Sequence, residues 1–172
     1  MQHEGKVPFN DHPAVLCFLK KWGLTENPTR LHYADHGYDA AQCHVSAKHK
    51  ALSDGGRRVH GWALWMFDDF LLADHHSVWE DSDGNLIDVT PPSSGGIEIL
   101  FVRDDTAIIE HVDGAIQLFT QRTADDSIHW FWQGHSSEYA NWQCSPDKAD
   151  LVAYTEKLNM PVLRILTEIQ HG

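Results

Sequence analysis

Three residues with complementary chemistry follow one another in the first half of the chain: Cys43, His76 and Asp88. A cysteine thiol becomes a strong nucleophile once it loses its proton, and a neighbouring imidazole is well suited to take that proton near neutral pH. A carboxylate that holds the imidazole fixes its tautomer and stabilises its cation. The three residue types therefore match a nucleophile, a general base and an orienting carboxylate, provided that the fold brings them together.

A β-hairpin is predicted by the stretch HHSVWEDSDGNLIDVTP, residues 75–91, which has two apolar-rich arms around a turn. With Gly84 left-handed in a three-residue loop, Val78 faces Asp88 on the opposite strand. Side chains alternate along a strand, so His76 and Asp88 share one face as diagonal neighbours. An aspartate inside a buried strand needs such a partner, because burying an unpaired carboxylate is costly.

The identity of the histidine depends on the register of this hairpin. His75 falls on the opposite face of the strand from His76, and a shift of one residue would pair His75 with Asp88 instead. The loop geometry favours His76 as the general base and acid, and His75 remains the alternative.

A helix is predicted over residues 40–52, with Asp39 as its N-cap and Gly55 and Gly56 at its end. Cys43 then lies in the first turn. Thiols at helix N-termini ionise more readily, because they face the positive end of the helix dipole and unsatisfied backbone N–H groups. The same N–H groups can hold an oxyanion formed on a substrate carbonyl. The alternative role for Cys43 is to pack its helix against the sheet.

The order of these residues resembles that of a group of enzymes. A cysteine near a capped helix start in "CHV", a histidine in "HHSVW" and an aspartate in "DGNLIDVTP" are similar to the transglutaminase-like branch of the papain-like cysteine protease superfamily. Cys43, His76 and Asp88 match its three catalytic positions. Three further residues match positions that often accompany them: Trp79, Thr90 and Pro91. The resemblance covers about residues 38–92.

The resemblance implies both a fold class and an activity. The fold would be α+β, with an antiparallel β-sheet packed against an N-terminal helical part that carries the nucleophile. The activity would be that of a cysteine hydrolase or acyltransferase, of protease, amidase or deamidase type, acting on an amide or ester bond through a thioester acyl-enzyme. The substrate would be a peptide, a protein or a small amide or ester, and no cofactor would be needed.

Two details differ from the pattern of that group. Trp79 follows His76 by three residues, where the aromatic residue often follows by two. Gln42 stands next to the nucleophile rather than at the upstream spacing of a side-chain oxyanion donor. We therefore expect backbone N–H groups near Cys43 to form the oxyanion hole.

The remaining elements favour a single α+β domain over residues 1–172. An apolar stripe predicts a helix over residues 12–22, with Asp11 as its cap and Gly23 at its end. Cys17 lies beside that stripe and is expected to be an inert, buried thiol. Strands are predicted at residues 58–67, 70–80, 85–90, 97–103, 107–112, 115–121 and 128–132. Further predictions are a hairpin turn at residues 112–115 and helices from Ser145 and over 161–170.

The composition disfavours two classes of partner. A formal net charge of -12 disfavours nucleic acid, because phosphate binding requires clustered Lys and Arg, and it disfavours anionic membrane surfaces. No apolar run is long enough to cross a bilayer, and residues 1–11 lack a basic-then-apolar signal pattern. We therefore expect a soluble, cytoplasmic protein. Aromatic-rich sheet edges are compatible with a homodimer.

One alternative to catalysis is a binding protein that keeps the fold and uses an aromatic cleft. Trp62 and Trp65 lie on a strand beside the predicted site, although core packing explains them better. A second aromatic group follows later in the chain: Trp130, Phe131, Trp132, Tyr139 and Trp142.

The other alternative is a metal-dependent hydrolase. His44, together with the pair His75 and His76, would bind a metal with Cys43 or Asp88, since imidazole, thiolate and carboxylate all suit zinc. Adjacent residues on one helix or strand seldom point at the same ion, so the sequence disfavours this set of ligands and no metal site is predicted.

Overall fold

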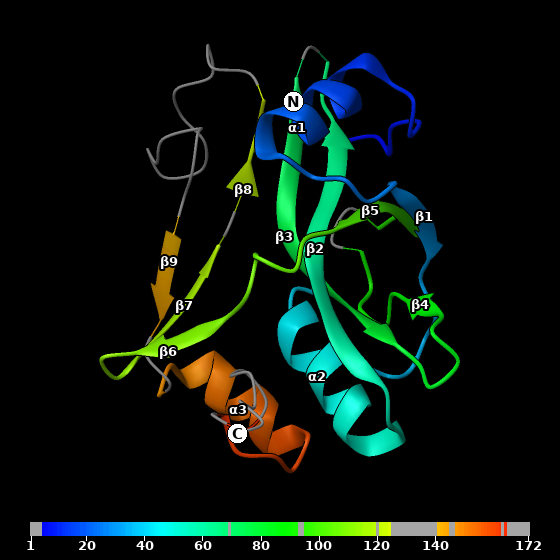
Figure 1. The fold of residues 1–172 in the computed structure, drawn as a ribbon. Helices are drawn as coiled ribbons and strands as arrows, with labels where there is room; N and C mark the ends of the chain where they lie inside the picture. The colour runs from blue at the N-terminus through cyan, green and yellow to red at the C-terminus, as the bar shows by residue number, and fades with distance from the viewer. Residues whose placement is uncertain are drawn as a thin grey trace.

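Two antiparallel sheets and three helices make up the computed structural model, which describes residues 5–68, 70–92, 95–119, 121–124, 141–144, 147–162 and 164 (Figure 1). The helices are α1 (Pro13–Trp22), α2 (Cys43–Asp54) and α3 (Ala149–Lys157). The strands are β1 (Thr29–His32), β2 (Arg57–Met66), β3 (Leu71–Glu80), β4 (Leu86–Ile87), β5 (Glu98–Arg103), β6 (Glu110–Val112), β7 (Ala115–Phe119), β8 (Gln121–Arg122) and β9 (Asn141–Cys144). The predicted α+β class with an antiparallel sheet is confirmed. None of the helices in the described ranges has the length and apolarity needed to span a membrane.

The larger sheet carries both strands of the predicted hairpin. Its strand order is β1-β5-β2-β3-β4, its paired strands are antiparallel, and β8 pairs with part of β3. The long strands β2 and β3 run through its middle (Figure 1). The sheet curls so that its two edges meet at a parallel bridge between Tyr33 and Asp88. Ala34 N donates to Asp88 O at 2.9 Å at this junction, so the segment that leads from β1 towards α2 is anchored beside Asp88.

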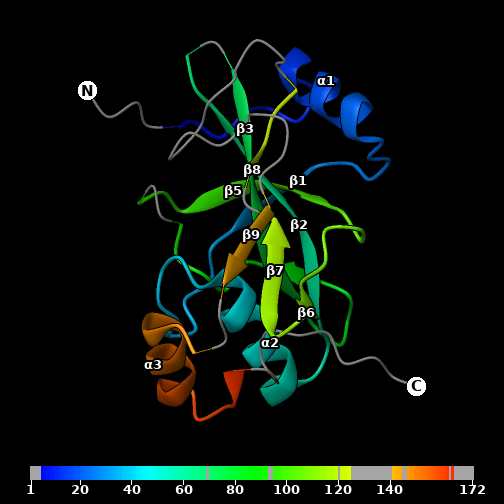
Figure 2. The same ribbon diagram turned by 90° about the vertical axis from the view of Figure 1, so that its left-hand side faces the viewer.

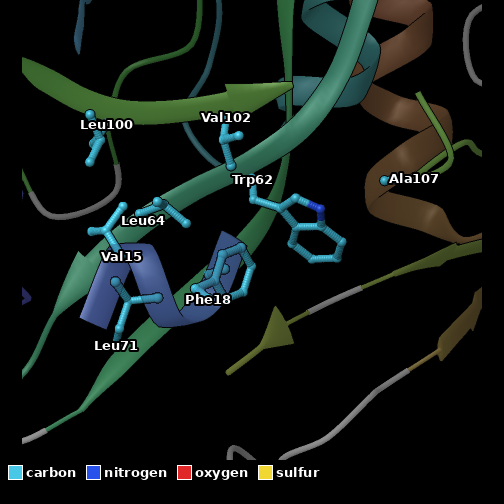
Figure 3. Close-up of a cluster of buried hydrophobic side chains, with 9 residues drawn as sticks. Val15, Phe18, Trp62, Leu64, Leu71, Leu100, Val102 and Ala107 are labelled. Carbon is cyan, nitrogen blue, oxygen red and sulfur yellow. The ribbon is translucent and has the colours of Figure 1, made fainter. Parts of the chain in front are cut away.

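The two faces of the larger sheet bury different apolar groups. On one face, Val15 and Phe18 of α1 pack near Leu64 and Leu71, with Trp62 further along β2 (Figure 3). The other face packs around a second group: Leu31, Val59, Ala63, Trp65, Val78, Ile99 and Phe101. Because both faces are covered, residues 58–65 of β2 are buried without a break.

The smaller sheet has the order β6-β7-β9. Its first hairpin turns at Asp113 and Gly114, whose φ values of 49° and 79° suit a tight two-residue turn, so the predicted hairpin is confirmed. Helices α2 and α3 lie near each other at one end of the molecule (Figures 1 and 2). A buried group joins them to the second sheet: Val45, Ile109, Ile116, Leu151 and Tyr154.

The predicted cap of α1 was wrong, and so was the burial predicted for its cysteine. His12 caps the helix in place of Asp11, because its Nδ1 accepts from Ala14 N at 3.1 Å. Gly23 ends the helix with a φ of 65°, as predicted. Cys17 is exposed, since the side of α1 that faces the sheet is occupied by Val15 and Phe18.

Helix α2 begins at Cys43, three residues later than predicted, with Gln42 at its N-cap. Asp39 does not cap it. The Asp39 carboxylate accepts from Lys157 Nζ at 2.7 Å, and the Asp39 backbone N–H donates to the Tyr154 hydroxyl at 3.1 Å. Asp39 thus contacts α3, more than a hundred residues away in the chain, and the left-handed Ala41 separates it from the start of α2.

Most strand predictions hold, with bounds that shift or shorten. The strand predicted at 115–121 is divided between β7 of the smaller sheet and β8, which pairs with β3 of the larger sheet. The strand predicted at 85–90 is only Leu86–Ile87, and that predicted at 107–112 is Glu110–Val112. Strands β1 and β9 were not predicted, and β1 is only four residues long, with Leu31 its one buried position. The helix predicted from Ser145 is α3, which begins later, at Ala149, with Lys148 at its N-cap. Three predictions lie outside the described residues: the strand at 128–132, most of the helix over 161–170, and the side chains of the second aromatic group.

Candidate active site

The β3–β4 hairpin has the register that the sequence predicts. Trp79 pairs with Ile87, which places Val78 opposite Asp88. Gly84 has the left-handed φ of 84° that the three-residue loop requires. The register therefore follows from local turn chemistry.

The structure brings Cys43, His76 and Asp88 together. His76 Nε2 lies 3.1 Å from Asp88 Oδ1, and the same histidine is hydrogen-bonded to the Cys43 thiol. Because Nε2 is engaged by the carboxylate, we infer that Nδ1 is the ring nitrogen that faces the thiol. Cys43 is partly buried, and the side chains of His76 and Asp88 are 14% and 1% exposed. We call these three residues the triad cluster.

The triad cluster favours a positively charged His76. Burial alone lowers the pKa of His76, but the charges of Asp88 and Cys43, and the hydrogen bonds to both, raise it well above its ordinary value. The pKa of His76 rises because two acidic groups face one ring in a site that is largely closed to water. The geometry therefore stabilises the imidazolium form of His76.

Neighbouring backbone groups hold Asp88 in place. Its Oδ1 also accepts from Thr90 N at 3.2 Å, and its backbone is bridged to Tyr33. Its Oδ2 is buried and has no hydrogen-bond partner within the described part of the chain. A nearly buried carboxylate with one oxygen lacking a donor gains most from an adjacent cation, which His76 supplies.

A second carboxyl on this face has a different environment. Asp74 precedes His76 by two residues on β3, and burial raises its pKa, although a hydrogen bond from Gln121 Nε2 at 2.9 Å acts in the opposite direction. Asp74 therefore favours its protonated form relative to an exposed aspartate. Sequence reasoning did not single it out, and Asp88 remains the carboxylate that contacts His76.

A glycine makes room for the ring that packs on His76. Gly61 pairs with His76 across β2 and β3. A Cβ atom at position 61 would lie 2.1 Å from Val102 O and 2.7 Å from the Phe101 ring. The Phe101 ring lies edge-on to His76, with centroids 6.3 Å apart. The missing side chain thus lets the adjacent strands and Phe101 close around the histidine.

Cys43 is the first residue of α2, and its helix start has features suited to oxyanion binding. Gln42 makes no side-chain capping hydrogen bond, and the first helical bond runs from Ser46 N to Gln42 O at 2.9 Å. The N–H groups of residues 43–45 precede that bond and have no acceptor within the helix. Ala41, immediately before the N-cap, has a left-handed φ of 61°, which is strained for a residue with a Cβ.

A second polar group, which we call the imidazole cluster, consists of His44, His60 and His75. Each ring offers one nitrogen, and these three nitrogens lie within 4.8 Å of one another. The rings of His44 and His75 are closest, with centroids 4.4 Å apart. The three come from three elements, since His44 is on α2, His60 on β2 and His75 on β3.

Hydrogen bonds to Ser77 and to the Ala107 carbonyl hold the rings of the imidazole cluster. Ser77 Oγ lies 2.7 Å from His44 Nδ1 and 2.8 Å from His60 Nδ1, and Ser77 itself is fully buried. His75 Nε2 lies 2.6 Å from the Ala107 carbonyl oxygen, so it donates its proton there. These contacts orient all three rings.

The environment of His44 favours its neutral form. Burial lowers the pKa of His44 well below its ordinary value, and the charges of His75, His60, Arg58 and His76 act in the same direction. Arg58 is also anchored here, because its Nη1 donates to the His44 carbonyl oxygen at 2.9 Å.

Of the metal ligands considered from sequence, His44 and His75 meet, but without His76, Cys43 or Asp88. His75 faces away from His76 and Asp88, as strand alternation predicts, and it joins His44 with His60. Sequence reasoning missed His60. The signal that could have found it is the pairing of β2 with β3, which places His60 opposite Ser77 and Trp62 opposite His75.

The two tryptophans near the site are core residues. Trp62 is fully buried and its Nε1 donates to Asp104 Oδ2 at 2.8 Å, while Trp65 lies on the other face and is 9% exposed. They fill the interior on the two sides of β2. Neither residue offers an exposed aromatic surface.

Comparisons of the chain with family models, with curated proteins and with solved structures gave no match.

Proposed function

We propose that the chain is a cysteine hydrolase or acyltransferase that acts on an amide or ester bond. Cys43 is the nucleophile, His76 the general base and acid, and Asp88 the carboxylate that orients His76. The observation that carries this proposal is the hydrogen-bonded series from Cys43 through His76 to Asp88, with the thiol on the first residue of a helix.

The first half of the reaction forms a thioester. His76 takes the thiol proton, and the Cys43 sulfur attacks the substrate carbonyl carbon, forming a C–S bond and an oxyanion. The C–N or C–O bond to the leaving group then breaks, and His76 returns the proton to the departing amine or alcohol. Asp88 keeps the imidazolium in place while it carries that proton.

The second half of the reaction releases the acyl group. Water or an amine attacks the thioester, His76 takes the proton of the attacking group, and the Cys43 thiolate leaves and is reprotonated. Backbone N–H groups at the start of α2 hold the oxyanion in both halves, because the first N–H groups of a helix have no acceptor within it.

The proposed fold relationship is to the transglutaminase-like branch of the papain-like cysteine proteases. Its support is the arrangement of a cysteine at a helix start, a histidine on β3 and an aspartate at the end of β4, on an antiparallel sheet. The substrate class is a peptide, a protein, or a small amide or ester.

The experiment compares two thiols within one molecule. Purified protein is treated with p-nitrophenyl acetate, quenched in acid at short times, and analysed by peptide mass spectrometry for acetylation of Cys43 and Cys17. Cys17 is an exposed free thiol and serves as the internal control. We expect Cys43 to be acetylated about 100-fold faster than Cys17, because His76 acts as its general base.

The variant His76→Gln should remove most of that difference, and Cys17→Ser should leave the burst of nitrophenolate unchanged. Equal acetylation rates for the two thiols in the wild-type protein would contradict the proposal. So would a Cys43 rate that His76→Gln leaves unchanged in a protein with native circular dichroism.

A further inference from the structure

The imidazole cluster brings three buried or partly buried rings from three separate elements to one point. The three nitrogens of His44, His60 and His75 lie within 4.8 Å of one another. A tetrahedral zinc site with Zn–N bonds of about 2.0–2.1 Å places its nitrogen ligands about 3.3 Å apart. Small side-chain rotations, which shorten these separations by at most about 1.5 Å, would meet that geometry.

We propose that His44, His60 and His75 bind a divalent transition-metal ion of the zinc class. The proposal does not depend on the role of Cys43, because none of its ligands belongs to the triad cluster.

The hydrogen bonds that the rings make are those that a metal site needs. Histidine ligands usually donate their second ring N–H to a fixed acceptor, which sets the tautomer and orients the ring. Ser77 Oγ meets Nδ1 of His44 and of His60, so Nε2 is the atom that each would present to the metal. The Ala107 carbonyl accepts from His75 Nε2, which makes Nδ1 the corresponding atom of His75.

The donor set selects the class of ion. Three imidazoles without a carboxylate suit zinc and the neighbouring first-row metals, whereas magnesium and calcium prefer oxygen ligands. Neutral imidazoles are the form that coordinates a metal. The chain has a formal net charge of -12, so the long-range field of the protein also attracts a cation.

A metal at this point would tie α2 to the sheet next to the triad cluster. His44 follows Cys43 on α2, and His75 precedes His76 on β3. Coordination of His44 and His75 would therefore fix the two backbones that carry the thiol and its base.

The experiment measures metal binding directly. Full-length protein is stripped with a chelator, titrated with Zn²⁺ and with Co²⁺, and assayed for stoichiometry by elemental mass spectrometry and for ligand type by X-ray absorption at the zinc edge. We expect one zinc per chain, scattering from imidazole rings and no Zn–S shell near about 2.3 Å. The wild-type spectrum needs no variant, so it decides the ligand type even if a substituted protein fails to fold.

The variants locate the site. His60→Gln and His75→Gln should each weaken Zn²⁺ binding by about 100-fold or more, and Ser77→Ala by about 10- to 100-fold. Two controls should bind zinc as the wild type does: Cys43→Ala, which removes the neighbouring thiol, and His32→Gln, which removes a histidine whose side chain is 72% exposed.

Three results would overturn the proposal. They are the absence of stoichiometric zinc binding, a Zn–S shell that Cys43→Ala abolishes, and binding that His32→Gln weakens while His60→Gln does not. Each differs from a failure of the proposed enzymatic function, which is read from acetylation of Cys43.

Discussion

The triad cluster and the imidazole cluster are built from adjacent residues but have opposite electrostatic character. Cys43 and His44 are neighbours on α2, and His75 and His76 are neighbours on β3. In the triad cluster, acidic partners raise the pKa of His76. In the imidazole cluster, burial and the other basic groups lower the pKa of His44. The two clusters therefore place His76, whose charged form is favoured, close to His44, whose neutral form is favoured.

The difference arises because strand alternation places the partners of the two clusters on opposite faces of β3. Successive side chains of β3 point to opposite faces, so His76 reaches Asp88 while His75 and Ser77 reach His44 and His60. The two clusters are carried by the same helix and the same strand, but the side chains of each cluster have their own hydrogen-bond partners. Removal of one side chain should therefore break the hydrogen bonds of one cluster at a time.

The largest expected effect comes from Asp88→Asn. The amide cannot stabilise the His76 cation, so acetylation of Cys43 should slow by up to about 100-fold while zinc binding is unchanged. The measurement is the burst rate with p-nitrophenyl acetate beside a zinc titration. Asp83→Asn, in the exposed turn of the same hairpin, is the matched control and should behave as the wild type. Equal rates for Asp88→Asn and the wild type would show that the carboxylate has no catalytic role.

The next effect is on stability and comes from Gly61→Ala. A Cβ at this position meets Val102 O and the Phe101 ring, so strands must shift and the free energy of unfolding should fall by about 1–3 kcal/mol. Because Gly61 lies opposite His76, the acetylation rate should fall as well. Urea unfolding followed by circular dichroism measures the first quantity. An unfolding free energy equal to that of the wild type would show that the packing around His76 is looser than described.

The protonation contrast can be tested in metal-free protein by NMR of the histidine rings. His76 should keep its proton above pH 6.5, the ordinary histidine value, and His44 should stay neutral below it. The stabilisation from His76 is present below about pH 6.5 and is lost as pH rises through its folded pKa. For His44, stability falls as pH drops below about 6.5, because the unfolded chain then binds a proton that the folded ring does not. Titration of both rings at the same pH would remove the distinction between the clusters.

The smallest effect is expected from Ala41→Gly. Ala41 has a left-handed φ of 61°. Glycine relieves that strain but adds flexibility to the unfolded chain, so the net gain in unfolding free energy should be under about 1 kcal/mol. Thermal unfolding measures the change, and acetylation of Cys43 reports whether the strained turn also positions the thiol. A clear loss of stability would mean that the left-handed turn is not the source of strain.

Much of the triad cluster could be predicted from sequence because its geometry is local. The loop around Gly84 sets the register of the hairpin, and the register sets the distance between His76 and Asp88. Cys43 was placed at a helix start, but the start itself was misplaced, because Asp39 is taken by Lys157 and Tyr154 of α3. Local capping preferences could not reveal a partner so distant in the chain.

The imidazole cluster could not be predicted in the same way. His44, His60 and His75 lie on three elements, and their meeting depends on how α2 lies against the sheet and how β2 pairs with β3. The burial of Cys17 failed for a similar reason, since the rotation of α1 on the sheet decides which side of the helix is covered.

By itself, the sequence determined the α+β class, the β3–β4 hairpin with its register, and the shared face of His76 and Asp88, because turn chemistry and the two-residue period of a strand act over a few residues. Only the tertiary structure decided that α2 starts at Cys43, that the thiol meets His76, and that His60 joins His44 and His75. Those contacts join residues far apart in the chain, and they form when burial of apolar faces brings separate elements together.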